Sequence, residues 1–211
     1  MRATAVLLLL LFPPLTPALA AVPGADDPAR LAYILQEAVD APDSAAALRH
    51  LDLESLVAAA IDEELPRINE RVKRGELILS PPLALALAGL NEGSPAMRGM
   101  ISGFLAAELG KFIAYGIDGG FFAGRPRPDD ELALLDGGVF SLLGRISGSR
   151  KELSGAETLI LEGDSALIRL ELSDAATGGR YPLELRLRRA DGLWKIIRIE
   201  NTAALFPPAR P

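Results

Sequence analysis

The chain contains no cysteine and a single histidine, His50, in 211 residues. Without cysteine there can be no disulfide framework, thiolate zinc site or cysteine nucleophile. The densest acidic cluster, Asp62-Glu63-Glu64, consists of consecutive residues, and consecutive side chains of a helix point in different directions. We therefore expect no metal site and no cofactor, and a surface or helix-capping role for His50.

Positive charge is also scarce. The chain has 22 Lys and Arg residues against 28 Asp and Glu residues, a net charge of −6. A general nucleic-acid binder would show a basic patch or stripe, so we expect no nucleic-acid partner. The glycines follow no phosphate-loop order. Carboxylates such as Glu108 and Asp129-Asp130-Glu131 are candidates for acid–base chemistry by residue type alone, so no catalytic residue is assigned and an enzyme is the least favoured class.

The first twenty residues have the three parts of a secretory signal peptide. Arg2 gives a positive start, the segment from Ala3 to Phe12 is apolar apart from Thr4, and Ala18-Leu19-Ala20 is a small-x-small cleavage site. The apolar run is too short for a membrane span, which needs about 20 residues. We expect cleavage after Ala20, no transmembrane span in the mature chain, and a periplasmic or secreted location.

Residues 21–211 are predicted to form a single α+β domain, mainly helical over 27–150 and an antiparallel sheet over 156–200. Helices are expected to start at the caps Asp27, Asp43 and Asp52, with a kink or break at Pro66. A short helix is expected to begin at Asp129 and Asp130 and to end before Gly137.

A further helix is predicted from Ser94-Pro95 to Gly119. It has a broad apolar face that includes Met97, Met100 and Phe104. Gly99 and Gly103 lie four residues apart, a spacing that can let another helix approach closely. The pattern favours a buried core helix, and the alternative is a helix that lines an apolar ligand cavity.

Four strands are predicted over 158–162, 166–172, 181–189 and 193–200, because apolar and polar residues alternate there between compact turns. Gly163-Asp164 and Asp191-Gly192 are the turn signals. In the last strand Trp194 and Ile196 alternate with Ile197 and Ile199, which predicts that both faces are covered and that the strand is central. The fold class is therefore α+β, with N-terminal helices packed on a C-terminal antiparallel four-stranded meander.

The segment Asp191-Gly192-Leu193-Trp194-Lys195-Ile196 resembles the closing strand of secreted bacterial members of the nuclear-transport-factor-like, cystatin-like α+β superfamily. The resemblance covers residues 155–200 and implies a cone-like sheet around helices with an apolar cavity. A weaker similarity, carried by V-A-A-A-I-D-E-E-L-P from Val57 and by Ser94-Pro95-Ala96-Met97-Arg98, is to the periplasmic phospholipid carriers of the Mla pathway. The chain departs from those carriers after its tryptophan strand, where it reads Glu200-Asn201-Thr202-Ala203.

Two function classes are carried forward. The first is an exported, non-enzymatic binding protein for an apolar or amphipathic ligand such as a lipid; the alternative is a cell-envelope module that binds a protein without a ligand cavity. Five aromatic residues are candidates for lining a pocket: Phe104, Phe112, Tyr115, Tyr181 and Trp194. Arg186 and Arg188 form a cationic strip on the third strand, which is a candidate site for an anionic headgroup or partner or a solvated sheet face.

Overall fold

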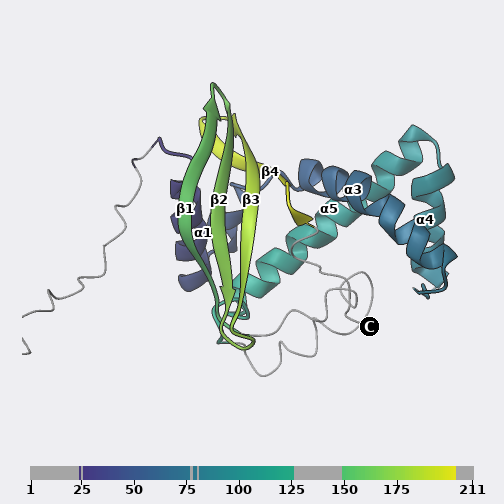
Figure 1. Ribbon diagram of the computed structural model, residues 1–211, viewed down its shortest axis with the longest axis horizontal. Helices are drawn as coiled ribbons and strands as arrows, with labels where there is room; N and C mark the ends of the chain where they lie inside the picture. The colour runs from purple at the N-terminus through teal and green to yellow at the C-terminus, as the bar shows by residue number, and fades with distance from the viewer. Residues whose placement is uncertain (1–23, 25, 77, 80, 126–148, 203–211) are drawn as a thin grey trace, which may run out of the picture.

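The computed structural model describes residues 24, 26–76, 78–79, 81–125 and 149–202, so the predicted signal peptide and the short helix expected from Asp129 lie outside the described residues. Within these described residues, five helices come first: α1 (Arg30–Asp40), α2 (Ser44–Leu48), α3 (Leu53–Lys73), α4 (Pro81–Glu92) and α5 (Pro95–Asp118). The four antiparallel strands of the described residues follow: β1 (Lys151–Glu162), β2 (Ser165–Asp174), β3 (Gly179–Ala190) and β4 (Leu193–Ile199). The α+β class is confirmed (Figure 1).

The sheet is a meander in the order β1-β2-β3-β4. Its turns are those that the sequence predicts, since Gly163, Asp191 and Gly192 all have positive φ, as compact hairpin turns require. Alternate residues of β2 and β3 point to one face and are buried, among them Ile168, Leu170, Leu185 and Leu187. β1 is seven residues longer at its start than predicted.

β4 is an edge strand, so the prediction of a central position is wrong. Its outer edge is covered by the segment that leads into α3. His50 O accepts from Ile196 N at 2.9 Å, and Asp52 N donates to Ile196 O at 3.0 Å. A bulge explains the irregular apolar pattern of β4: Ile196 pairs with Leu187 and Ile199 with Leu185, so Ile199 packs on the same core as Ile196.

His50 belongs to this junction and is buried, which corrects the expectation of a surface position. Its Nδ1 lies 2.9 Å from the carbonyl oxygen of Trp194. Trp194 itself packs in the main core with Leu31 and Ala32 of α1 and the inner residues of β2 and β3. The core thus lies between the sheet and α1.

Three helix starts follow the predicted caps, whereas α1 starts at Arg30 with Ala29 as its cap residue, so the cap predicted at Asp27 is wrong. Asp43 accepts from Ala46 N at 2.9 Å, Asp52 from Ser55 N at 3.0 Å and Ser94 from Met97 N at 3.3 Å. Pro66 does not break α3, which runs on as one helix. Pro66 is exposed, so the carbonyl that loses its helical donor there can be hydrated. The helix α4 was not predicted as a separate element.

Figure 1 shows that the helices do not all cover the sheet. α1 lies against the sheet. α3 starts beside β4 and runs away from the sheet, and α5 returns diagonally to one end of the sheet. α4 lies at the far side of α3 and α5 from the sheet. We call residues 67–107 the arm: the end of α3, all of α4 and the first half of α5. The arm projects from the sheet-and-helix body.

The burial pattern of the sheet predicts where substitutions matter. Leu187 is fully buried in the main core and Leu161 is more than half exposed on β1. Leu187→Ala should lower the free energy of unfolding by about 3 kcal/mol, and Leu161→Ala by less than about 1 kcal/mol. Chemical denaturation of the two variants checks this; equal losses would contradict the assigned core.

Candidate binding surface

The three segments of the arm are held together by polar and close apolar contacts. Asn69 of α3 and Asn91 of α4 exchange two side-chain hydrogen bonds of 2.7 and 2.8 Å. Arg98 donates from Nε to the carbonyl oxygen of Leu90. Gly89 lets α4 approach α5 closely, because a Cβ there would come within 2.7 Å of Ile101 Cδ1. The arm is therefore a packed unit.

The outward side of α5 in the arm is apolar and uncovered by the described residues. Exposed side chains recur at three- and four-residue steps, which places them on one helix face. They are Ala96, Met100, Gly103, Phe104 and Ala107, and we call these five residues the apolar strip. Met100 is 69% and Phe104 58% exposed, and the strip extends over about 16 Å.

Gly99 and Gly103 do not bring another helix of the described chain onto α5. A Cβ added at either position meets nothing within 4 Å, so that expectation is wrong. The prediction of a buried core helix holds for the second half of α5, where Phe112 and Ile117 are buried, and fails for the first half. α5 is long and apolar enough to cross a membrane by length and composition, and 22% of its most apolar stretch is buried.

The arm exposes further large apolar side chains. Ile78, in the connection between α3 and α4, is 92% exposed, and Leu85 on α4 is 76% exposed; Met97 borders the strip. An apolar side chain in water loses the favourable transfer free energy that burial would give it. Clustered exposure of this kind marks interaction sites.

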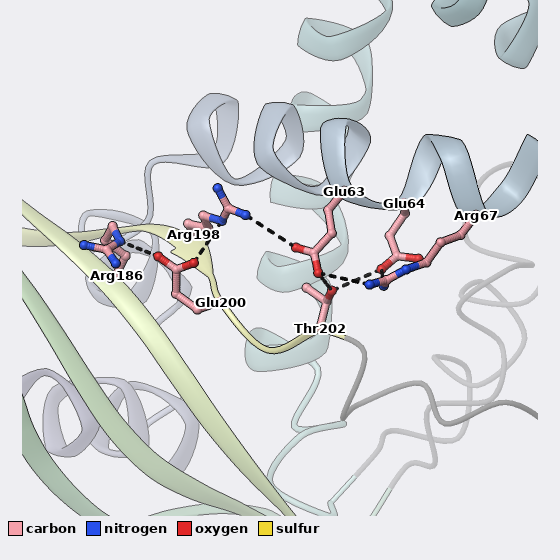
Figure 2. A network of polar contacts seen from close by, with 7 residues as sticks. All are labelled: Glu63, Glu64, Arg67, Arg186, Arg198, Glu200 and Thr202. Atoms are coloured by element: carbon pink, nitrogen blue, oxygen red, sulfur yellow. Dashed lines mark hydrogen bonds and ion pairs between the residues drawn. The ribbon is translucent and has the colours of Figure 1, made fainter.

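A polar network fastens the body to the base of the arm (Figure 2). Thr202, near the end of the described chain, is buried, and its Oγ1 lies 2.6 Å from Glu63 Oε1 and 3.1 Å from Glu64 Oε1. A hydroxyl has one proton, so it donates to one carboxylate at a time. Arg67 pairs with both glutamates, at 3.7 and 2.6 Å.

The network continues to the sheet through Glu200. Its carboxylate pairs with Arg186 of β3 and, at 3.2 Å, with Arg198 of β4, and Arg198 also lies 3.8 Å from Glu63. Each carboxylate thus faces a guanidinium, and the network joins α3, β3, β4 and the segment after β4. This balanced arrangement fixes the direction in which α3 leaves the sheet.

Asp52 makes a second attachment at the start of α3. Its carboxylate caps the helix and pairs with Arg188 Nη2 at 2.9 Å. Partial burial raises the pKa of Asp52, but hydrogen bonds from the Ser55 backbone and side chain and the charge of Arg188 outweigh it, so the pKa lies below its ordinary value. The carboxylate is therefore stabilised in its charged form.

The predicted anion candidates Arg186 and Arg188 both face carboxylates of this chain, Glu200 and Asp52. These carboxylates are the ones that attach α3 to the sheet. Arg186 and Arg188 are therefore already engaged in ion pairs within the chain.

The five aromatic pocket candidates lie in different parts of the fold. Phe104 is on the arm, Phe112 packs edge-on against Phe122 at 5.7 Å with Tyr115 on the same helix, and Tyr181 is half-buried at the start of β3. Trp194 donates from Nε1 to Asp26 O at 3.2 Å and lies under Arg189, whose Cζ is 5.4 Å from the ring. The structure does not bring the five together.

A hollow at one end of the sheet is polar, lined among others by Arg150, Glu152, Asp174 and Arg180. Among the described residues there is no group of three or more potential His, Cys, Asp or Glu metal ligands. The apolar surface of the arm is thus the feature with the clearest chemistry.

Sequence reasoning missed the Glu63–Thr202 attachment and the exposed residues Ile78 and Leu85. The sequence did hold a signal for α4, which carries Leu85: Pro81-Pro82 is a typical helix start and Glu92-Gly93 a typical helix end. Nothing local links Glu63 to a threonine 139 positions away.

No protein-family model, curated protein or solved structure matches this chain. The family resemblances therefore stay predictions.

The lowered pKa of Asp52 makes stability depend on acid pH. The carboxylate stabilises the fold above its unfolded value near 3.8, and this contribution is lost as the pH falls through the lower folded pKa. Asp52→Asn keeps a capping oxygen and has no titrating group, so its unfolding free energy should fall less than that of the wild type from about pH 6 to about pH 2.5. Arg188→Gln should weaken the dependence in part. Identical acid profiles for all three proteins would contradict the assigned pairing.

Proposed function

We propose that this chain is an exported, non-enzymatic binding protein whose contact surface is the apolar surface of the arm. The observation that carries the proposal is the apolar strip of α5, with Met100 and Phe104 more than half exposed on a helix whose second half packs against the body. The partner is apolar or amphipathic, because that is the chemistry that would bury such a surface favourably.

The way the arm is attached supports this reading. Two sets of ion pairs, around Asp52 and around Glu63 and Glu200, hold α3 to the sheet. They set the direction of the helix at its first half, and its second half carries the arm outward (Figure 1). A fixed, projecting apolar surface suits binding, since less order must be imposed when the partner arrives.

Placement outside the cytoplasm is part of the proposal and is supported by the signal-like segment at residues 1–20. The carboxylates described above are engaged in ion pairs that join elements, which supports a structural role for them. A protein partner in the envelope and a lipid are both compatible with an apolar contact surface.

The proposal predicts loss of binding when the strip becomes polar. Dodecyl maltoside micelles present an apolar phase, so the wild-type chain from residue 21 onward, without the predicted signal peptide, should comigrate with them, or self-associate without them, in size-exclusion chromatography with light scattering. The double variant Met100→Gln/Phe104→Gln should weaken this by at least about tenfold. Its unfolding free energy should stay within about 1 kcal/mol of wild type, because both side chains are largely exposed.

The matched control is Leu159→Gln/Leu161→Gln, which removes two exposed apolar side chains from β1 in the body. It should retain the wild-type behaviour. A wild type that stays monomeric and free of micelles, or a control as defective as the strip variant, would refute the proposal.

A further inference from the structure

Charge on the arm has the opposite sign to charge on the rest of the protein. Residues 67–107 contain five cationic side chains and three anionic ones, whereas the whole chain has a net charge of −6. The cationic residues are Arg67, Arg71, Lys73, Arg74 and Arg98, and all five are exposed.

Arg67 pairs with Glu63 and Glu64, so the residues beyond it, 68–107, carry four cations and three anions. Lys73 and Arg74 pair with Glu70 and Glu76, but these pairs are exposed and therefore weak, and Arg71 and Arg98 have no carboxylate partner among the described residues. A small excess of positive charge thus coincides with the apolar surface.

Several of these cations lie close in sequence to an exposed apolar residue. Arg71, Lys73 and Arg74 end α3, and Ile78 follows in the connection to α4; Arg98 lies between Met97 and Met100. Apolar side chains beside Lys and Arg are the pattern of segments that lie in the interface of a membrane containing anionic lipid.

We infer that the arm binds the surface of a bilayer that contains anionic lipid. This inference rests on the proposed function and names its partner. The apolar side chains of the arm would enter the boundary between headgroups and acyl chains, while the cations meet lipid phosphates. The exposed apolar residues come from three elements: the α3–α4 connection, α4 and α5. A lipid bilayer is fluid, so it can adapt to these projecting side chains without a preformed complementary groove.

The arm lies on the bilayer and does not span it. The second half of α5 carries Glu108, Lys111 and Asp118 and packs against the body. Asp118 accepts hydrogen bonds from Ser44 N at 3.0 Å and Ser44 Oγ at 2.7 Å. Moving all of α5 into hydrocarbon would break these contacts and desolvate the charges, so contact is confined to the first half.

The test is cosedimentation of residues 21–211, the chain that the predicted cleavage after Ala20 leaves, with vesicles of phosphatidylcholine alone or with about 30% phosphatidylglycerol. The wild type should bind the anionic vesicles about tenfold more tightly than the neutral ones, and about 0.5 M salt should reduce the difference. Arg71→Gln/Lys73→Gln should weaken binding to anionic vesicles about tenfold. Met100→Gln/Phe104→Gln should weaken binding to both kinds of vesicle.

The control is Arg49→Gln/Arg180→Gln, which makes the same change in net charge at exposed positions of the body. It should bind like the wild type. Equal binding to both vesicles, or an equal loss in the control, would overturn the inference.

Two other outcomes separate this inference from the proposed function. In the first, the chain self-associates or binds micelles through the strip but does not bind either kind of vesicle. The arm then binds a protein, such as a second copy of the chain, so the bilayer inference fails and the proposed function stands. A chain that binds neither vesicles nor micelles and stays monomeric refutes both.

Discussion

The attachment of the first half of α3 to the sheet is the constraint on which the rest of the structure depends. Backbone hydrogen bonds between residues 50–52 and Ile196 cover the open edge of β4. The Asp52–Arg188 pair and the network around Glu63 and Glu200 add charge-assisted contacts along the helix. The same attachment closes the sheet edge, orients α3 and holds the arm away from the core.

This arrangement separates two kinds of apolar surface. The inner face of β2 and β3 is buried against α1 and accounts for the main core. The apolar strip of α5 adds nothing to that core, because it faces outward. Apolar side chains that stay exposed in the folded chain contribute little to its stability, and they are best understood through binding, where their burial contributes free energy to an association.

The sequence predicted those parts of the fold that depend on local chemistry. The local signals are the alternation of apolar and polar residues in β2 and β3, the turns at Gly163 and Asp191, and the helix caps Asp43, Asp52 and Ser94. α4 was missed because Leu83, Leu85 and Leu87 alternate at a two-residue step and give no helical face.

Tertiary contacts decided the remainder. The cover on the outer edge of β4 comes from residues 50–52, about 145 positions before Ile196, and the Glu63–Thr202 contact joins residues 139 apart. For the candidate site, periodicity identified Met100 and Phe104 as apolar face residues, but whether the chain itself covers such a face depends on the path of other elements. The aromatic pocket candidates were selected by type, and type does not fix proximity.

The absence of cysteine allows one direct measurement of the central claim, that the arm is the contact surface. A single cysteine replacing Met100 can carry an environment-sensitive fluorophore, and the same label at Thr177, in the turn between β2 and β3, reports on the body. With anionic vesicles or micelles present, the account predicts a blue shift at position 100 and none at position 177. An unchanged spectrum at position 100, or equal shifts at both positions, would contradict it.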